Sequence, residues 1–360
     1  RGRNLHWGSS GMSTPSGASV GPARLDIPLD QPGRHVGALR LPWSHDRSAY
    51  GQIVIPVVVI NGGPGPTALC TGGVHGDEYE GPIVLGALAR ELASGDINGR
   101  LIIVPTANPP AAQAGRRTSP IDGGNLARLF PGEANGGPTS QIAEGITRLL
   151  LPAADYLVDF HSGGSTLDYL PCAFGRLPTD RALAARVLDL LAAFGAPVTA
   201  VVKRPEAKGT LVAAALDAGV AAMATELGGS GGVTRQTVAI AADGLRRALG
   251  HMGILPGDAA LARAPDAPST RLLAVAGEHF LRAPGRGLFE PAFMLGDRVA
   301  AGDVAGWLSD PERPDRAPEP LHFAAAGIVI CRRVPALAEP GDVLVHLAED
   351  TTREALIDGI

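Results

Sequence analysis

The stretch Gly72-Gly73-Val74-His75-Gly76-Asp77-Glu78-Tyr79-Glu80-Gly81 lies between two segments with different hydrophobic patterns. The apolar run at 67–71 predicts a buried strand, and the pattern at 83–92 predicts a helix. His75 and Glu78 therefore lie on a strand-to-helix turn, where both can offer metal-ligand atoms on one side. Two ligands do not complete a catalytic metal site, so a third ligand, a base and an oxyanion donor must come from elsewhere in the chain.

Strand and helix patterns alternate through the first two thirds of the chain. This alternation predicts an α/β fold with a mostly parallel twisted sheet and helices on both faces. Ligand sites in such sheets lie beyond the carboxyl ends of the strands. His75, His161 and Glu226 each follow a predicted strand. Strands are expected at 52–60, 67–71, 101–106, 156–160, 198–202 and 221–225, and helices at 81–94, 141–151, 180–194, 210–218 and 233–251.

Composition divides the chain into four parts. Residues 1–20 are rich in Gly and Ser and are expected to be disordered, with Met12 as the natural start and the preceding residues left over from expression. Residues 21–256 hold the α/β pattern, and 257–269 read as an Ala/Pro/Asp linker. Residues 270–360 show short strand-like runs separated by turn signals, which predict a small all-β domain. The polar segment 108–138 is expected to be a long functional loop.

Charge and cysteine content exclude several classes of function. The 360 residues carry a net charge of -5, with 31 basic and 36 acidic side chains, which argues against a nucleic-acid partner. No apolar run is long enough to span a membrane. The 3 cysteines are far apart, lie in apolar runs and form no CxxC pair. We therefore expect a cytoplasmic protein without a disulfide framework.

His75, Glu78 and His161 together form a plausible zinc-ligand set. Zinc favours neutral imidazole and carboxylate ligands, and a catalytic site leaves a position open for water. Any one of the three could instead be a satisfied polar residue in a turn, but their shared position at strand ends favours a metal site. Asp159 lies two residues before His161 on the same strand face, where it could hold a ring nitrogen. The alternative is an ordinary buried carboxylate.

The remaining chemistry has candidates at a strand end and in the long loop. Glu226 follows an apolar strand, where burial raises the pKa of a carboxyl group toward the range of a general base; a capping or salt-bridged role is the alternative. Arg116, Arg117 and Arg128 bracket the long loop. One guanidinium could stabilise an oxyanion and another could bind a substrate carboxylate, although a solvated surface arginine is the default for each.

Four motifs in this order resemble the succinylglutamate desuccinylase/aspartoacylase family, and the resemblance runs from about residue 61 to the C-terminus. Within the family, the bacterial Nα-acetyl-L-2,4-diaminobutyrate deacetylases of ectoine breakdown are the most similar branch. The motifs are Gly73-Val74-His75-Gly76-Asp77-Glu78, then Arg117-Thr118-Ser119-Pro120-Ile121-Asp122-Gly123-Gly124-Asn125-Leu126-Ala127-Arg128-Leu129-Phe130-Pro131-Gly132, then Asp159-Phe160-His161-Ser162-Gly163-Gly164, and Thr225-Glu226-Leu227-Gly228-Gly229.

The resemblance implies a zinc carboxypeptidase-like α/β fold in 21–256, followed by a C-terminal β domain. It also implies one Zn²⁺ per chain and assigns roles to individual residues. Zinc would be held by His75, Glu78 and His161; Glu226 would be the base, Arg117 would lie at the scissile carbonyl, and Arg128 and Asn125 would bind the substrate.

The chain departs from the family pattern at one position. Ala127 precedes Arg128 where the family usually has Asn, which helps the arginine bind the substrate carboxylate. The departure therefore concerns the substrate more than the reaction. The C-terminal β domain is similar to the module of the family, and it contains no lysine, which excludes a lipoyl or biotinyl carrier. We expect it to narrow the mouth of the cleft.

These observations predict a zinc-dependent amidohydrolase that removes an acetyl or succinyl group from an N-acyl amino acid, with Nα-acetyl-L-2,4-diaminobutyrate as the substrate implied by the branch. The cation of a diamino acid would require an acidic partner, for which Asp168 and Glu290 are candidates. A metallocarboxypeptidase on the same fold and a non-catalytic binding homologue are the alternatives. The expected partners are a small-molecule substrate and, in a homo-oligomer, further copies of the chain.

Overall fold

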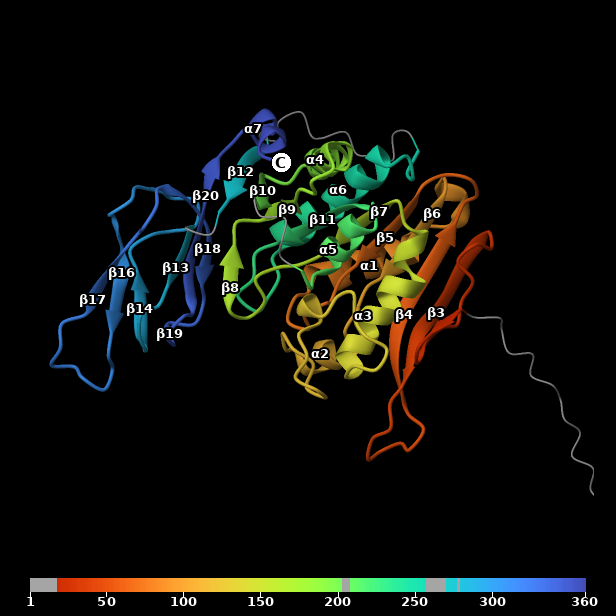
Figure 1. Cartoon of the computed structure of the whole chain (residues 1–360), viewed down its shortest axis with the longest axis horizontal. Helices are drawn as coiled ribbons and strands as arrows, with labels where there is room; N and C mark the ends of the chain where they lie inside the picture. The colour runs from red at the N-terminus through yellow and green to blue at the C-terminus, as the bar shows by residue number, and fades with distance from the viewer. Residues whose placement is uncertain (1–17, 203–207, 257–269, 277–278) are drawn as a thin grey trace, which may run out of the picture.

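The computed structural model describes residues 18–202, 208–256, 270–276 and 279–360. The expected linker at 257–269 and nearly all of the expected disordered N-terminal segment lie outside these residues. In the described part, sixteen strands join one large sheet and four form a smaller one. Helices flank the large sheet, and the smaller sheet lies at the opposite end of the molecule from the N-terminal hairpin (Figure 1). The α/β fold with a small C-terminal β sheet is therefore confirmed.

The elements follow one another as the sequence pattern requires, with the long helices between the central strands. The strands are β1 (Ser19–Val20), β2 (Ala23–Leu25), β3 (Gly33–Pro42), β4 (Gln52–Asn61), β5 (Thr67–Thr71), β6 (Arg100–Val104), β7 (Tyr156–Asp159), β8 (Leu167–Tyr169), β9 (Cys172–Arg176), β10 (Val198–Val202), β11 (Ala221–Glu226), β12 (Arg271–Val275), β13 (Phe280–Arg282), β14 (Gly287–Pro291), β15 (Arg298–Val299), β16 (Val304–Ser309), β17 (Glu319–His322), β18 (Gly327–Arg333), β19 (Leu337–Ala338) and β20 (Val343–Asp350). The α-helices are α1 (Glu80–Glu91), α2 (Pro109–Ala114), α3 (Pro138–Leu149), α4 (Arg181–Phe194), α5 (Leu211–Asp217), α6 (Arg235–His251) and α7 (Arg353–Asp358), and short 3-10 turns lie at Ser94–Asp96, Leu126–Arg128 and Leu151–Ala153.

The centre of the large sheet is parallel and its flanks are antiparallel. Strands β6, β5, β7 and β11 lie side by side in parallel, and β9, β10 and β12 form a second parallel group. The β3–β4 hairpin extends one flank, and β20, β18 and β15 extend the other. In the register of the central strands, Tyr156 pairs with both Ala68 and Ala221. The carboxyl ends of β5, β7 and β11 therefore meet at one edge.

Burial along the strands explains why they form where they do. The first half of β4 alternates between exposed and buried residues, as expected for a strand with one solvated face, and its second half is buried throughout. All five residues of β5 are buried, and α1 packs against this strand. Helix α6 contacts both α1 and α4, whereas α3 contacts α5 and the β2–β3 edge (Figure 1).

The main helices begin and end at residues suited to those positions. Asp180 accepts hydrogen bonds from the first-turn amides of α4, and α4 ends at Gly195 in the left-handed conformation. Thr234 and Thr237 form a reciprocal cap at the start of α6. The hydroxyl of Thr237 also donates to Glu80 Oε1 at 2.9 Å, which joins the N-terminal ends of α6 and α1.

The segment 108–138, expected to be a loop throughout, contains helix α2 and the 3-10 turn at Leu126–Arg128, and α3 begins at its last residue. Helix α2 begins after Asn108, whose side chain accepts from the amide of Ala111. Pro109 and Pro110 occupy the first helical positions, where a missing amide hydrogen costs nothing. Helix α3 likewise begins at Pro138. The prolines that read as loop residues therefore mark helix starts.

The C-terminal part is joined to the α/β part by strand pairing and by packing. Strand β12 pairs in parallel with β10, and β20 pairs with both β12 and β18. Leu356 of α7 is buried in the main core against α4. The small sheet β17-β16-β14-β19 has its own core around Phe289, Phe293 and Phe323. The division at 257–269 stays a prediction, whereas the hydrogen-bonded sheet runs from one part into the other.

Candidate active site

The turn between β5 and α1 carries two of the predicted metal ligands. Gly73 has φ of +60°, a conformation that glycine adopts without strain. A Cβ atom on Gly76 would lie 2.0 Å from the backbone carbonyl carbon of Ala111, so α2 packs directly against this glycine. The chain therefore turns tightly, and the side chains of His75 and Glu78, each residue 3% exposed, are buried.

The three predicted ligands lie together. Glu78 Oε1 is 2.6 Å from His75 Nδ1, and Glu78 Oε2 is 2.8 Å from His161 Nδ1. One ligand atom from each of the three residues lies within 4.8 Å of the others, which is close enough to hold one metal ion. The two imidazole rings are 5.0 Å apart between centroids. The turn after β5 and the end of β7 thus supply a single cluster.

The outer nitrogen of each histidine has its own partner. Asp159 Oδ2 is 3.0 Å from His161 Nε2, and the other oxygen of Asp159 accepts from the Thr71 hydroxyl at 2.6 Å. Asn125 Oδ1 is 3.1 Å from His75 Nε2. Oxygen acceptors at both Nε2 atoms favour a proton there, which would leave each Nδ1 free to bind a metal ion. Each Nδ1 faces an oxygen of Glu78.

This donor set fits a divalent transition metal such as zinc. It offers two imidazole nitrogens and a carboxylate, and each histidine is oriented by a second polar group, as in known metal sites. Burial lowers the pKa of His75, so its imidazole is the neutral form that metals bind. Burial works against the charged form of His161, but Asp159 and Glu78 raise its pKa well above the usual value, so the metal-free cluster favours a positive charge on this imidazole.

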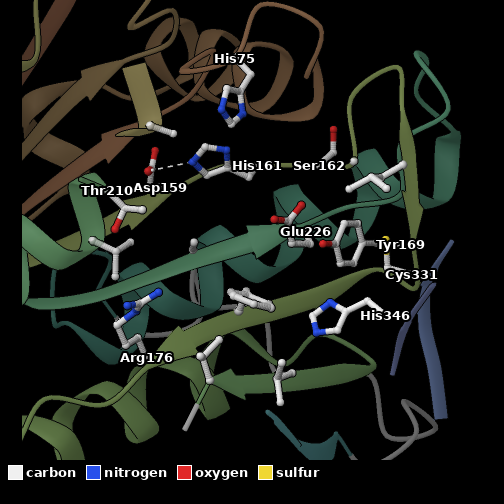
Figure 2. Close-up of a pocket in the computed structure, with 18 of the residues that line it drawn as sticks. His75, Asp159, His161, Ser162, Tyr169, Arg176, Thr210, Glu226, Cys331 and His346 are labelled. Carbon is white, nitrogen blue, oxygen red and sulfur yellow. Dashed lines mark hydrogen bonds and ion pairs between the residues drawn. The ribbon is translucent and has the colours of Figure 1, made fainter. Parts of the chain in front are cut away.

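Glu226 faces the cluster from the end of β11. The residue is half-buried, its Oε2 is closed off without a hydrogen-bond partner, and its side chain points toward His161 (Figure 2). Burial, followed by the negative charge of Glu78, raises the pKa of Glu226 to about 8, although His161 and nearby arginines oppose the shift. A carboxyl group with such a pKa can take up and release a proton near neutral pH.

Arg117 and Arg128 lie at the same site, whereas Arg116 does not. The guanidinium Nη1 of Arg117 is 3.6 Å from Glu78 Oε1. Arg128 donates to the carbonyl oxygen of Ala127 at 2.8 Å, and burial and the charge of Arg117 lower its pKa. Arg116 is exposed, and its carbonyl oxygen accepts a hydrogen bond from the backbone in the metal-ligand turn. Two of the three arginines considered are thus close to the cluster.

The other predicted substrate contacts lie in different surroundings. Asn125 contacts His75 and also caps the turn that follows it, accepting from the Ala127 amide at 3.1 Å. Asp168 is paired with Arg332 at 3.0 Å and is not among the cavity-lining residues. Glu290 is exposed on β14 in the small sheet and does not line the cavity either. Neither acidic residue is therefore part of the cavity wall.

A cavity of about 560 Å³ contains the cluster, Glu226 and both arginines. Its far wall is built by residues that the sequence did not indicate, because they are brought together by long-range strand pairing. These are Tyr169 on β8, Cys331 on β18, His346 on β20 and Phe280 on β13. Figure 2 shows Tyr169, Cys331 and His346 on the other side of Glu226 from His75 and His161.

Comparisons with known proteins agree with this geometry. The sequence model of the Succinylglutamate desuccinylase/Aspartoacylase catalytic domain matches residues 64–252, more than half of the chain. The chain is 40% identical to an N-alpha-acetyl-L-2,4-diaminobutyric acid deacetylase from Halomonas elongata over 328 residues, which cover 91% of this chain and 95% of the relative.

Two solved structures with high sequence identity share the fold. The product-bound ectoine utilization protein EutE from Ruegeria pomeroyi is 42% identical, with a TM-score of 0.86 over 92% of this chain and 100% of that one. A succinylglutamate desuccinylase/aspartoacylase from Rhodobacter sphaeroides is 37% identical, with a TM-score of 0.87 over 92% and 99% of the two chains. The chain therefore belongs to the succinylglutamate desuccinylase/aspartoacylase family of amide hydrolases.

Proposed function

We propose that this protein is a zinc-dependent deacetylase that cleaves Nα-acetyl-L-2,4-diaminobutyrate or a closely related Nα-acetyl diamino acid. The observation that carries the proposal is the shared cavity, in which Glu226 faces the His75–Glu78–His161 cluster beside two arginines. The identity to the Halomonas deacetylase and to EutE supports the choice of the acetyl group and the amino acid.

Each residue near the cluster has a distinct proposed task. His75, Glu78 and His161 would hold the metal, and Asp159 and Asn125 would fix the two histidine tautomers. A zinc ion in this site would supply Lewis acidity, which makes water more acidic and an amide carbonyl more electrophilic.

Glu226 would move the proton that amide hydrolysis requires. Its carboxylate takes a proton from the attacking water and, as a carboxylic acid, returns it to the leaving amine. Both steps suit a group whose pKa lies at about 8 in the metal-free protein. Arg117 would donate hydrogen bonds to the carbonyl oxygen as it gains charge, and Arg128 would bind the α-carboxylate. Both side chains line the cavity.

The proposed cellular compartment, the cytoplasm, rests on the three cysteines. All three are free and buried, as expected of a protein that acts in a reducing cytoplasm. None of the helices in the described part of the chain combines the length and the apolar character that crossing a membrane requires.

The substitution Glu226→Gln tests the proposal directly, because it keeps the shape of the side chain and removes its proton chemistry. We expect kcat for Nα-acetyl-L-2,4-diaminobutyrate to fall by about 10²- to 10⁴-fold, while the zinc content measured by elemental analysis stays at the wild-type value. Wild-type protein should also be assayed with N-succinyl and N-formyl amino acids, with and without added zinc. Full activity in the variant, or zinc-independent turnover by the wild type, would refute the mechanism.

A further inference from the structure

Four side chains form a row across four neighbouring strands in the C-terminal part of the large sheet. Cys331 on β18 is paired with Tyr169 on β8 and with His346 on β20, and His346 is paired with Phe280 on β13. Residues paired across strands project from the same face of a sheet. All four line the cavity of the hydrolytic centre, so the row forms one continuous wall of it.

Within the row, His346 is the residue whose buried polar atoms lack hydrogen-bond partners. The residue is 2% exposed, and neither Nδ1 nor Nε2 has a hydrogen-bond partner among the described residues. Its ring stacks on Phe280, with centroids 3.9 Å apart and planes at 15°, and it meets the Tyr169 ring edge-on at 6.5 Å. Burial lowers the pKa of His346 to about 3, so the imidazole is neutral and carries one donor and one acceptor.

Such an arrangement calls for a ligand group. Buried polar atoms in folded proteins are nearly always paired, and leaving them unpaired is costly. Because His346 lines the cavity, a group bound there can supply the partner. The imidazole is therefore positioned to recognise a polar group of a bound molecule.

The position of Glu226 indicates which part of the substrate reaches the row. Glu226 must contact the leaving nitrogen to return its proton, so the amino acid attached to that nitrogen lies on the Glu226 side of the cavity. Tyr169 borders Glu226 there: burial, followed by the charge of Glu226, raises the pKa of Tyr169. With the α-carboxylate at Arg128, the side chain of the amino acid is the arm left to extend along the row.

We propose that His346 and the aromatic rings beside it form the subsite for the side-chain amino group of the substrate. The imidazole accepts a hydrogen bond from the amine, and the Tyr169 ring beside it favours a cation. Among the described residues that line the cavity, the only carboxylates besides Glu226 are Glu78 and Asp159 at the cluster. The amine is therefore recognised by a neutral acceptor within an aromatic wall. This inference rests on the proposed function and names how the same site selects its substrate.

Two substrates of equal shape isolate the subsite. Nα-acetyl-L-norvaline has a methyl group where Nα-acetyl-L-2,4-diaminobutyrate has the side-chain amine. We expect wild-type protein to prefer the amine substrate, mainly through a lower KM. In His346→Phe, which keeps a ring against Phe280, kcat/KM for the amine substrate should fall about tenfold, while that for the norvaline substrate should not fall. His346→Gln, which keeps hydrogen-bonding atoms, should retain part of the preference.

A matched control and the wild-type comparison keep the test decisive. His322→Phe replaces an exposed histidine on β17 outside the cavity and should leave the ratio of the two kcat/KM values unchanged. An unchanged ratio in folded His346→Phe overturns the proposal. If thermal melting shows that this variant does not fold, equal kcat/KM values for the two substrates in wild-type protein overturn it. Failure of wild-type protein to cleave any N-acyl amino acid would instead refute the proposed function.

Discussion

The carboxyl group of Glu226 is buried beside the negative charge of Glu78, and it also lines the cavity. Burial and Glu78 raise its pKa to about 8 from the ordinary value of 4.5. The folded, metal-free protein therefore binds a proton at Glu226 that the unfolded chain has already released at neutral pH. This difference links the protonation of one residue to the stability of the whole protein.

The linkage predicts how stability depends on pH. Because the folded-state pKa is the higher one, the stabilising contribution of protonated Glu226 is fully present below about pH 4.5 and is lost as pH rises through about 8. Relative to Glu226→Gln, chelator-treated wild-type protein should lose free energy of unfolding by up to about 1.4 kcal/mol for each pH unit within that window. Urea unfolding of both proteins at several pH values measures the difference. Parallel curves for the two proteins would contradict it.

At the residue scale, the sequence predicted the hydrolytic centre better than the wall opposite it. His75, His161 and Glu226 could be identified because each follows a buried strand, and strand ends meet at one edge of such a sheet. Asp168 was a candidate partner for the cation of a substrate. Its ion pair with Arg332 could not be foreseen, because the two residues are 164 positions apart in the chain. Nothing in the sequence indicated His346, because its place in the cavity depends on the pairing of β20 with β18.

Among the elements, the turn between β5 and α1 depends on the close approach of α2. At Gly76 the backbone of α2 occupies the space that a side chain would need. The amide of Gly76 donates a hydrogen bond to the carbonyl oxygen of Arg116 at 2.8 Å. The position of His75 next to it is therefore set by packing between two helices as well as by the turn itself.

The substitution Gly76→Ala tests this packing. We expect it to destabilise the protein by about 1–3 kcal/mol or more, because backbone rather than a flexible side chain must move, and to weaken zinc binding by displacing His75. Gly95→Ala is the matched control: a Cβ there meets nothing within 4 Å, and Gly95 has no positive φ. Its stability should be unchanged or slightly higher. Thermal melting and a zinc-binding titration compare the two, and equal behaviour would argue against the packing.

At the element scale, the strongly apolar strands and the long helices were predicted, whereas short or polar strands were not. Strand β3 was missed because its two glycines, its terminal Pro42 and the charged Arg34 and Arg40 obscured the alternation. Strands β8 and β9 were also missed, since three to five residues carry too little periodicity to be recognised. These strands acquire their structure from their neighbours in the sheet.

At the scale of the whole molecule, the last helix of the chain packs against the α/β part. Helix α7 packs on α4: Leu356 is 5% exposed within the main core, and Arg353 is 2.8 Å from Asp189 Oδ1. The C-terminal residues therefore support the α/β part from the outside, after the chain has already built the small sheet. The expectation of a separate all-β unit after residue 270 did not include this packing, because nothing in the local sequence of a six-residue helix indicates where it docks.

Truncating Leu356 should consequently weaken the α/β core. We expect Leu356→Ala to lower the free energy of unfolding by about 2–3 kcal/mol, through lost burial and the cavity left behind. Leu337→Ala, at a residue 43% exposed on β19, should change it by no more than about 0.5 kcal/mol. Urea unfolding monitored by circular dichroism separates the two outcomes. A neutral Leu356→Ala would mean that α7 contributes nothing to the core.

The place of β20 in the sheet affects the order in which the parts of the cavity are synthesised. Residues 343–350 leave the ribosome after the residues of the hydrolytic centre, yet His346 lies in the cavity wall, and β20 joins β12 to β18. The predicted metal ligands and Glu226 are synthesised more than a hundred residues earlier. A nascent chain can thus carry the complete set of predicted metal ligands and Glu226 while one wall of the cavity has not yet been synthesised.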